Sequence, residues 1–177
     1  GDWTSANSLG NFAGYYDTDK VLENLYEDQN YQLNQRRFVK ARLFDMLIGD
    51  WDRHEDQWAW GLTENGKQKI YEAVPLDMDQ VYFKYDGLFL SLAIAASGMK
   101  YFQSFKEKMG NIKTFNYEQR GIDRLFTNRL TANDWISIAT TLQRSLPDSV
   151  IERSVTQLPP EMYAVSGPGI ISKLKAR

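Results

Sequence analysis

The spacing of apolar residues changes from helical to alternating within the first half of this chain. Residues 33–48 carry an apolar stripe at helical intervals, and Gly49 follows them as a helix-ending residue. Residues 57–62 and 68–74 then alternate between apolar and polar side chains, as strands do. Asn65-Gly66 lies between these two runs and favours a tight hairpin turn. The pattern therefore predicts a helix, a charged turn and a β-hairpin in succession.

The rest of the chain is predicted to be mostly helical. Thr18 is expected to cap a helix that runs to about Asp28, and residues 88–96 are helical in character. Further helix starts are marked by cap-type residues: Thr131 with Asp134, Pro147 and Pro160. The predicted fold class is mainly α with a small β-hairpin (α+β).

Composition excludes several classes of protein and site. The chain has 177 residues, which suits one domain, and its net charge of −2 gives no reason to expect a nucleic-acid partner. Cysteine is absent, which excludes disulfides, thiol nucleophiles and thiolate zinc sites. No apolar run in the sequence approaches the length of a transmembrane helix.

We expect the chain to consist of a short lead-in followed by one domain. Residues 1–16 are polar and contain glycine, which predicts an irregular lead-in, and residues 17–177 are predicted to form a single helical domain. Residues 170–177 keep a helical character without a Gly or Pro stop. We therefore expect this chain to be an excised piece of a larger protein.

Carboxylates concentrate in the turn after the predicted helix and again after the hairpin. The first group surrounds the only histidine, His54, and consists of Asp50, Asp52, Glu55 and Asp56. Like charges this close repel one another unless a cation, an arginine or hydrogen bonds compensate them. The second group is Asp77 and Asp79, which would project from one face of an extended segment, about 6–7 Å apart at the backbone. One divalent cation could engage both, so the pattern predicts a metal and phosphate site.

The order of these parts matches the order in which kinase C-lobes present their catalytic groups. Phosphoryl transfer needs one carboxylate near the attacking hydroxyl and others that hold the divalent ions on the nucleotide phosphates. Asp52 would take the first role, and Asp77 with Asp79 the second. Gln57 stands five positions after Asp52, where kinase catalytic loops carry a metal-binding Asn.

Two motifs carry a resemblance to known kinases. Ile48-Gly-Asp-Trp-Asp-Arg-His54 resembles the catalytic loop of atypical kinases: the HipA-type kinases, the secretory-pathway casein kinases and, more distantly, the phosphatidylinositol kinases. Leu76-Asp-Met-Asp-Gln-Val-Tyr-Phe83 is similar to the metal-binding segment of the CotH-type kinases. Together the motifs cover about residues 38–83. The resemblance implies a protein-kinase-like C-lobe.

The resemblance also implies roles for individual residues. Asp52 corresponds to the catalytic Asp, and Arg53 and His54 to the loop residues that hold the turn in shape. Asp77 corresponds to the metal-binding Asp, with Asp79 as a second candidate. Mg or Mn with ATP would be the cofactors, and Gln57 would contact them.

The string at residues 43–58 and the terminal Lys173-Leu-Lys-Ala-Arg177 carry a second resemblance. On them, most of the chain resembles a segment found downstream of metallophosphoesterase domains in exported proteins of Bacteroides-type bacteria. This resemblance implies a periplasmic or cell-envelope location, whereas the residues themselves indicate no compartment.

The chain departs from the kinase pattern in three ways. Asp50 stands where those kinases often have Asn, and Gln57 stands where many have the second metal-binding Asn, with an amide that reaches further. A G-x-G-x-x-G phosphate loop and a Val-Ala-Ile-Lys strand are both absent from the sequence. The expected partners are therefore a nucleotide and a missing N-terminal lobe or upstream domain, and we expect this chain alone to show no appreciable turnover of ATP.

Three functions remain open at this point. The first is an ATP- and Mg-dependent phosphotransferase C-lobe, and the second is a non-catalytic kinase-like scaffold or ligand-binding module of a larger exported protein. A metal-dependent hydrolase is weaker, because a single histidine does not supply the ligand sets of most dinuclear phosphoesterases. In a purely structural interpretation, the acidic turn only ends a helix, with Arg53 paired to Asp50 or Glu55.

Overall fold

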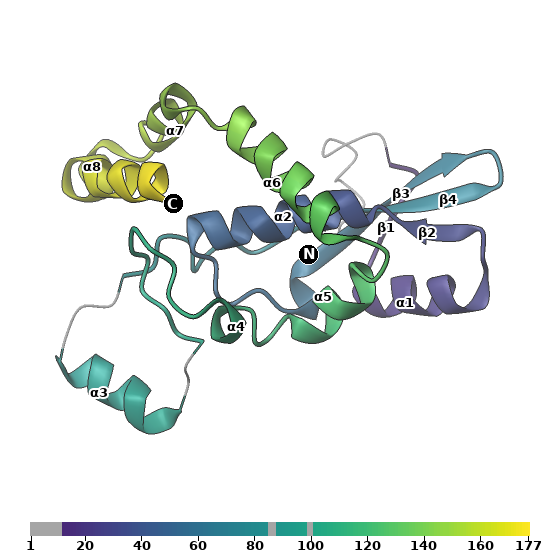
Figure 1. Cartoon of the computed structure of the whole chain (residues 1–177), viewed down its shortest axis with the longest axis horizontal. Helices are drawn as coiled ribbons and strands as arrows, with labels where there is room; N and C mark the ends of the chain where they lie inside the picture. Colours follow the sequence, from purple (N-terminus) through teal and green to yellow (C-terminus); the bar gives the residue numbers. More distant parts are fainter. Residues whose placement is uncertain (1–11, 85–87, 99–100) are drawn as a thin grey trace.

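A four-stranded sheet and the long helix α2 organise the computed structural model, which describes residues 12–84, 88–98 and 101–177 (Figure 1). The strands are β1 (Tyr15–Tyr16), β2 (Tyr31–Leu33), β3 (Trp58–Asn65) and β4 (Gln68–Pro75). The helices are α1 (Thr18–Glu27), α2 (Gln35–Ile48), α3 (Leu88–Ser97), α4 (Ile112–Phe115), α5 (Arg120–Phe126), α6 (Ala132–Ser145), α7 (Asp148–Val155) and α8 (Pro160–Ala176). The predicted α+β class is confirmed.

The predicted hairpin forms the centre of the sheet, whose strand order is β1-β3-β4-β2. β3 and β4 pair antiparallel from Trp58↔Pro75 to Asn65↔Gln68. Gly66 in the turn between them has φ +62°, a left-handed conformation that glycine adopts without a steric penalty. Both strands run further than the alternation alone indicated.

Two short strands flank the hairpin and were not predicted. β1 pairs antiparallel with β3, with Tyr15 opposite Gly61, and β2 pairs parallel with β4, with Tyr31 opposite Lys69. Tyr15 and Tyr16 thus belong to the sheet and not to an irregular lead-in. Residues 1–11, the rest of that predicted segment, lie outside the described residues.

The start of α1 differs from the prediction by one residue. Asp17, not Thr18, is the cap, since its carboxylate accepts a hydrogen bond of 2.7 Å from the backbone N–H of Lys20. Thr18 is buried, and its hydroxyl donates to the carbonyl of Glu55 at 2.6 Å. Thr18 therefore ties α1 to the acidic turn.

Helix α2 ends where the sequence indicated but begins later. Gly49 has φ +80°, and its N–H donates to the carbonyl of Asp45. The start lies at Gln35, with Asn34 as the cap, because Leu33 is already paired in β2. A tertiary contact therefore overrides the helical pattern at this end.

The C-terminal helices follow the predicted starts. Thr131 and Asp134 form the capping box of α6, and α8 begins at Pro160. α6 packs against α2, and α7 packs against α8, which lies near the C-terminal end of α2 (Figure 1). In the part of the chain that the structure describes, none of the helices has the length and hydrophobicity to span a bilayer.

Two hydrophobic clusters lie along α2. The first joins α1, α2, α5 and the sheet, and contains Val21, Phe38, Trp58, Trp60, Leu62, Tyr71, Ala73, Ile122 and Phe126. The second surrounds the C-terminal end of α2 and contains Ile48, Phe105, Val155 and Leu174. The acidic turn leaves α2 between these clusters.

Replacing Phe38 by Ala is expected to lower the free energy of unfolding by about 3–5 kcal/mol. The Phe38 side chain is fully buried, with its ring centroid 5.1 Å from that of Trp58 and 5.6 Å from that of Phe126. Urea unfolding followed by circular dichroism measures the change. Tyr26→Ala, at a side chain that is 94% exposed, is the control and should change stability by less than about 0.5 kcal/mol.

Candidate functional site

The guanidinium of Arg53 lies at the centre of the acidic turn and is buried, with 1% of the residue exposed. Its Nη2 donates to Asp50 Oδ2 at 2.6 Å and to Asp45 Oδ1 at 3.1 Å, and its Nε donates to Asp45 Oδ2 at 3.2 Å. The turn after α2 is therefore fixed to the last turns of the helix by charge-assisted hydrogen bonds.

The other side of the same guanidinium holds the ends of the hairpin. Nη1 of Arg53 donates to the backbone carbonyls of Gln57 at 3.1 Å, of Leu76, and of Asp77 at 3.4 Å. The N–H of Leu76 also donates to the carbonyl of Gln57 at 3.0 Å. One side chain thus joins the turn that carries Asp52 to the segment that carries Asp77 and Asp79.

Arg42 extends these contacts to the helical half of the molecule. Its guanidinium donates to Asp45 at 2.7 Å, to Asp123 at 2.9 Å and to Asn116 at 2.7 Å. The resulting chain Asp50–Arg53–Asp45–Arg42–Asp123 is called the buried charge network here. Asp45 accepts from both arginines, so it links them within α2.

Burial shifts the protonation of the carboxyls at both ends of this network. It raises the pKa of Asp50 from 3.8 to about 6, although the charge of Arg53 opposes the shift, and the charge of Asp45 adds to it. Burial likewise raises the pKa of Asp123 against the opposing charge of Arg42. The network holds three carboxyls and two guanidiniums, so a proton on one carboxyl balances its charge.

Asp52 lies outside this network, on the more open side of the turn. Partial burial raises the pKa of Asp52; the charge of His54 opposes this shift, and the charges of Asp79 and Asp77 increase it. Asp52, Asp77 and Asp79 therefore influence one another electrostatically.

The backbone of the second acidic group has an unusual conformation. Asp77 has φ +45°, in the left-handed region that non-glycine residues seldom occupy. Its carbonyl accepts from Arg53, and its Oδ1 accepts from the N–H of Asp79 at 3.4 Å. The buried arginine and this local hydrogen bond together support the conformation.

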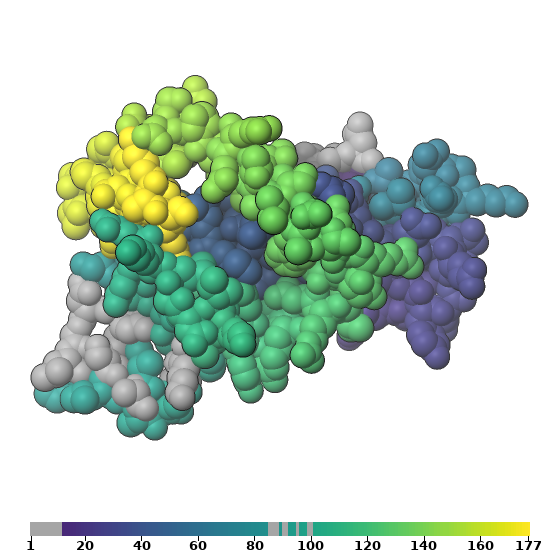
Figure 2. Space-filling view, in the orientation of Figure 1, coloured from purple at the N-terminus to yellow at the C-terminus, as the bar shows by residue number. Residues whose placement is uncertain are grey.

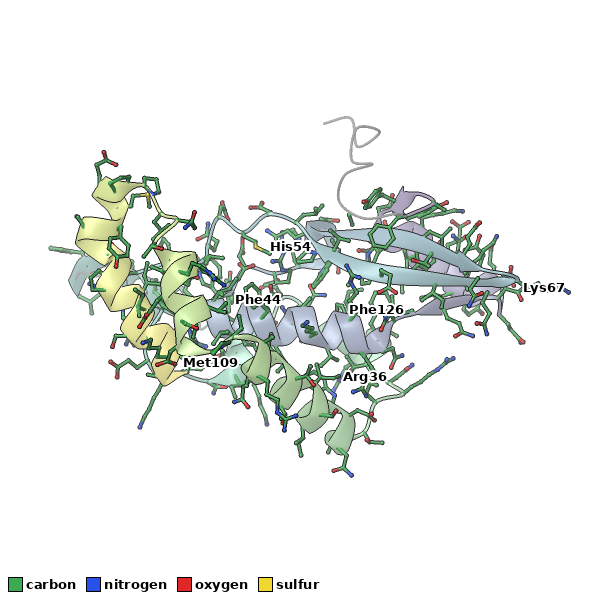
Figure 3. All side chains as sticks on the ribbon, turned by 90° about the horizontal axis from the view of Figure 1, so that it is seen from above. Arg36, Phe44, His54, Lys67, Met109 and Phe126 are labelled. Carbon is green, nitrogen blue, oxygen red and sulfur yellow. The ribbon has the colours of Figure 1, made fainter. Side chains whose placement is uncertain are left out.

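His54 lies at the end of the hairpin opposite the turn that carries Lys67 (Figure 3). Its Nδ1 is 3.8 Å from Asp56 Oδ2, and the Asp56 side chain is 89% exposed. The His54 carbonyl accepts from the N–H of Gln57 at 3.1 Å and from the side-chain amide of the buried Gln119 at 3.3 Å. Gln119 also accepts from Trp58 Nε1 at 3.3 Å, so His54 is held mainly through its backbone.

Gln57 supplies a buried oxygen without a donor. Only 7% of the residue is exposed, and Oε1 has no hydrogen-bond partner among the described residues. Burying a carbonyl oxygen without a partner lowers the stability of the fold unless a hydrogen-bond donor or a cation contacts it. Amide oxygens are ligands of hard divalent cations, so this atom fits the predicted contact with a metal–nucleotide complex.

The carboxylates do not converge on a single point. Across residues 12–84, 88–98 and 101–177, no three His, Asp or Glu side chains form a group that could hold a metal ion. A divalent ion here would need to combine Asp77 or Asp79 with non-carboxylate oxygens, which the amide of Gln57 and a nucleotide's phosphates would provide.

Three of the residues that bury this region were not predicted from the sequence. Asn116 and Asp123 contact Arg42 of α2, and Gln119 contacts Trp58 and the carbonyl of His54. The pair Arg42 and Asp45, three residues apart on one helix face, was the available signal for the network.

Replacing Asp50 by Asn, which does not titrate, should change how the free energy of unfolding depends on pH. The folded pKa is about 6, above the ordinary value of 3.8, so protonated Asp50 favours the native state below pH 4 and this contribution is lost as the pH rises through 6. The stability difference between the wild type and Asp50→Asn should therefore fall by up to about 3 kcal/mol between pH 4 and 7. Urea unfolding at constant ionic strength measures it. A difference that rises with pH would contradict the assignment.

Replacing Arg53 by Met should lower the free energy of unfolding by about 3–5 kcal/mol, because Asp50 and three carbonyls lose their buried partner. Thermal and urea unfolding measure the loss. Arg36→Met is the matched control: Arg36 also contacts a carboxylate at 2.6 Å, on Asp134, but its side chain is 51% exposed. That variant should lose less than about 1 kcal/mol. Equal losses in the two variants would show that the buried ion pairs of Arg53 contribute no more to stability than an exposed ion pair does.

Comparison with protein-family models, with curated proteins and with solved structures found no match. The kinase-like identity therefore stays a prediction that rests on the motifs.

Proposed function

We propose that this chain is the C-lobe of an atypical kinase, in which the acidic turn binds a metal–nucleotide complex and positions a phosphoryl acceptor. The observation that carries the proposal is the bridge through Arg53, which joins the Asp52 turn to the Asp77 segment across the mouth of the hairpin. Kinase catalysis needs this juxtaposition of an acceptor-side carboxylate and metal-side carboxylates.

Asp52 would act on the acceptor. Its carboxylate is partly exposed, and the raised pKa makes it a stronger base than an ordinary surface aspartate. In the proposed step Asp52 would orient the acceptor hydroxyl and take its proton as the oxygen attacks the terminal phosphorus, while the bond from that phosphorus to the bridging oxygen breaks and the nucleoside diphosphate leaves. The charge of His54 opposes the rise in the pKa of Asp52.

Asp77, Asp79 and the amide oxygen of Gln57 would hold the divalent ion on the nucleotide phosphates. When bound, that ion would neutralise charge that develops on the phosphoryl oxygens. Arg53 would act as a positioning residue, because its buried guanidinium reaches carbonyls and carboxylates of the chain and is not open to substrate. Catalysis would thus consist mainly of positioning and charge stabilisation.

A non-catalytic kinase-like scaffold is the second candidate. It is favoured by the lack of a three-ligand metal group among the described residues and by the hydrogen bond that turns Asp77 Oδ1 towards the N–H of Asp79. In this function the buried charge network would only stabilise a module of a larger exported protein.

Binding of Mn²⁺ with a non-hydrolysable ATP analogue separates the two candidates. We expect the anomalous signal of Mn²⁺ in a soaked crystal to lie against Asp77 or Asp79, within reach of Gln57 and with Asp52 facing the same space. In solution, electron paramagnetic resonance should show at least about tenfold weaker Mn²⁺ binding in the Asp77→Asn/Asp79→Asn variant.

Asp56→Asn is the control for that measurement, because Asp56 belongs to the same acidic stretch but its side chain is 89% exposed. Its Mn²⁺ affinity should match that of the wild type. An ion found elsewhere, or equal weakening in both variants, would rule out the phosphotransferase and leave the scaffold.

A further inference from the structure

Helix α3 belongs to an excursion of the chain, residues 84–104, that leaves and rejoins the body of the protein at one place. The N–H of Phe105 donates to the carbonyl of Phe83 at 2.8 Å, so the two ends of the excursion meet. Trp51 packs on both ends, with its ring centroid 6.4 Å from that of Phe83 and 4.1 Å from that of Phe102. Figure 1 shows α3 apart from the other helices, so the helix extends outwards from a packed base.

The outward face of α3 is apolar. Phe89 is 89% exposed and Leu92 is 58% exposed, and Ala93 and Ala96 are exposed as well. These four residues follow the spacing i, i+3, i+4 and i+7, so they share one side of the helix. In Figure 2 the teal atoms of α3 lie at the lower left edge of the molecule. The helix therefore presents a continuous apolar face at an edge of the protein.

The composition of α3 separates it from other helices that expose an apolar side chain. Ile136 of α6 and Val165 of α8 are also exposed, but both helices carry acidic and basic residues. The ten residues of α3 include no charged residue. At 1.5 Å per residue the helix is about 15 Å long, half the thickness of the hydrocarbon core of a bilayer. An apolar helix of this length is typical of a protein core or of a membrane interface, and the exposure of Phe89 is not that of a core helix.

The sequence around α3 is basic, although the chain as a whole is slightly acidic. Residues 84–113 contain five lysines and two acidic residues, a net charge of +3, whereas the net charge of the whole chain is −2. Lys84 precedes α3 in the sequence and Lys100 follows it. Two copies of this chain that met through α3 would bring two such positive segments together, which is unfavourable. A surface of anionic lipids has the complementary charge.

We propose that the apolar face of α3 inserts into the interface of an anionic lipid membrane. Phe89 and Leu92 would enter the boundary between head groups and acyl chains, and lysines of residues 84–113 would contact the anionic head groups. This insertion uses none of the carboxylates of the acidic turn, so it does not depend on the proposed phosphotransferase function.

Flotation of the purified chain with lipid vesicles tests the proposal. Vesicles of phosphatidylcholine and phosphatidylglycerol in equal amounts are compared with vesicles of phosphatidylcholine alone, at about 0.1 M salt. We expect the wild type to bind the anionic vesicles at least about tenfold more tightly than the neutral ones. Phe89→Ser/Leu92→Ser should weaken binding to the anionic vesicles at least about tenfold.

Ile136→Ser/Val165→Ser is the matched control for that variant. It also removes two exposed apolar side chains, which are 63% and 86% exposed on α6 and α8. Its affinity for the anionic vesicles should equal that of the wild type. Failure of the wild type to bind, equal binding to the two kinds of vesicle, or equal losses in the two double variants would overturn the proposal.

A fluorescent label locates the insertion. The chain has no cysteine, so Ala93→Cys and Tyr26→Cys each supply a single site for an environment-sensitive dye. With anionic vesicles, the emission of the dye at position 93 should shift to shorter wavelengths, and that of the dye at position 26, where the native residue of α1 is 94% exposed, should not. An unchanged emission at position 93 would contradict insertion. A shift that appears there without vesicles and grows with protein concentration would assign this face to a second copy of the chain, and would also overturn the proposal.

Discussion

Charges buried without water must be matched by other charges in a fixed geometry, and the buried charge network meets this requirement along the middle of the molecule. Asp45 accepts from Arg42 and Arg53 at once, so helix α2 holds both arginines in place. Arg53 then reaches the backbone on both sides of the hairpin. The positions of the acidic turn and of the Asp77 segment are therefore coupled through one guanidinium.

The candidate site lies in the turn that connects the two hydrophobic clusters along the chain. α2 contributes Phe38 to the first cluster and Ile48 to the second, and the acidic turn begins directly after Ile48. Elements packed on both sides give the turn a rigid base, while Asp52 itself stays on its open side. Functional groups carried by loops on rigid elements are common in proteins. The packed clusters thus hold the site in place, and the open side of the turn would bind a ligand.

Local patterns predicted the parts of the fold that local interactions determine. The hairpin, the helix end at Gly49 and the capping box at Thr131 each follow from residues close together in sequence. β1 and β2 could not be predicted, because strands of two and three residues have no alternation to read and exist only through their partners. The same limit applied to the site. Spacing predicted Asp52, Asp77 and Asp79 as candidates, whereas Asn116 and Asp123 reach Arg42 of the buried charge network only through the folded chain.

The sheet has a consequence for the order in which this chain assembles. Both outer strands come from residues that precede the hairpin: Tyr15 pairs with Gly61, and Tyr31 pairs with Lys69. Strands so short have no stability on their own, so β1 can form only when it pairs with β3, and β2 only when it pairs with β4. During synthesis on a ribosome, β1 can therefore pair only after Gly61 has left the exit tunnel, and β2 only after Tyr71 has left it. The sheet is completed from its centre outwards, against the direction of the chain.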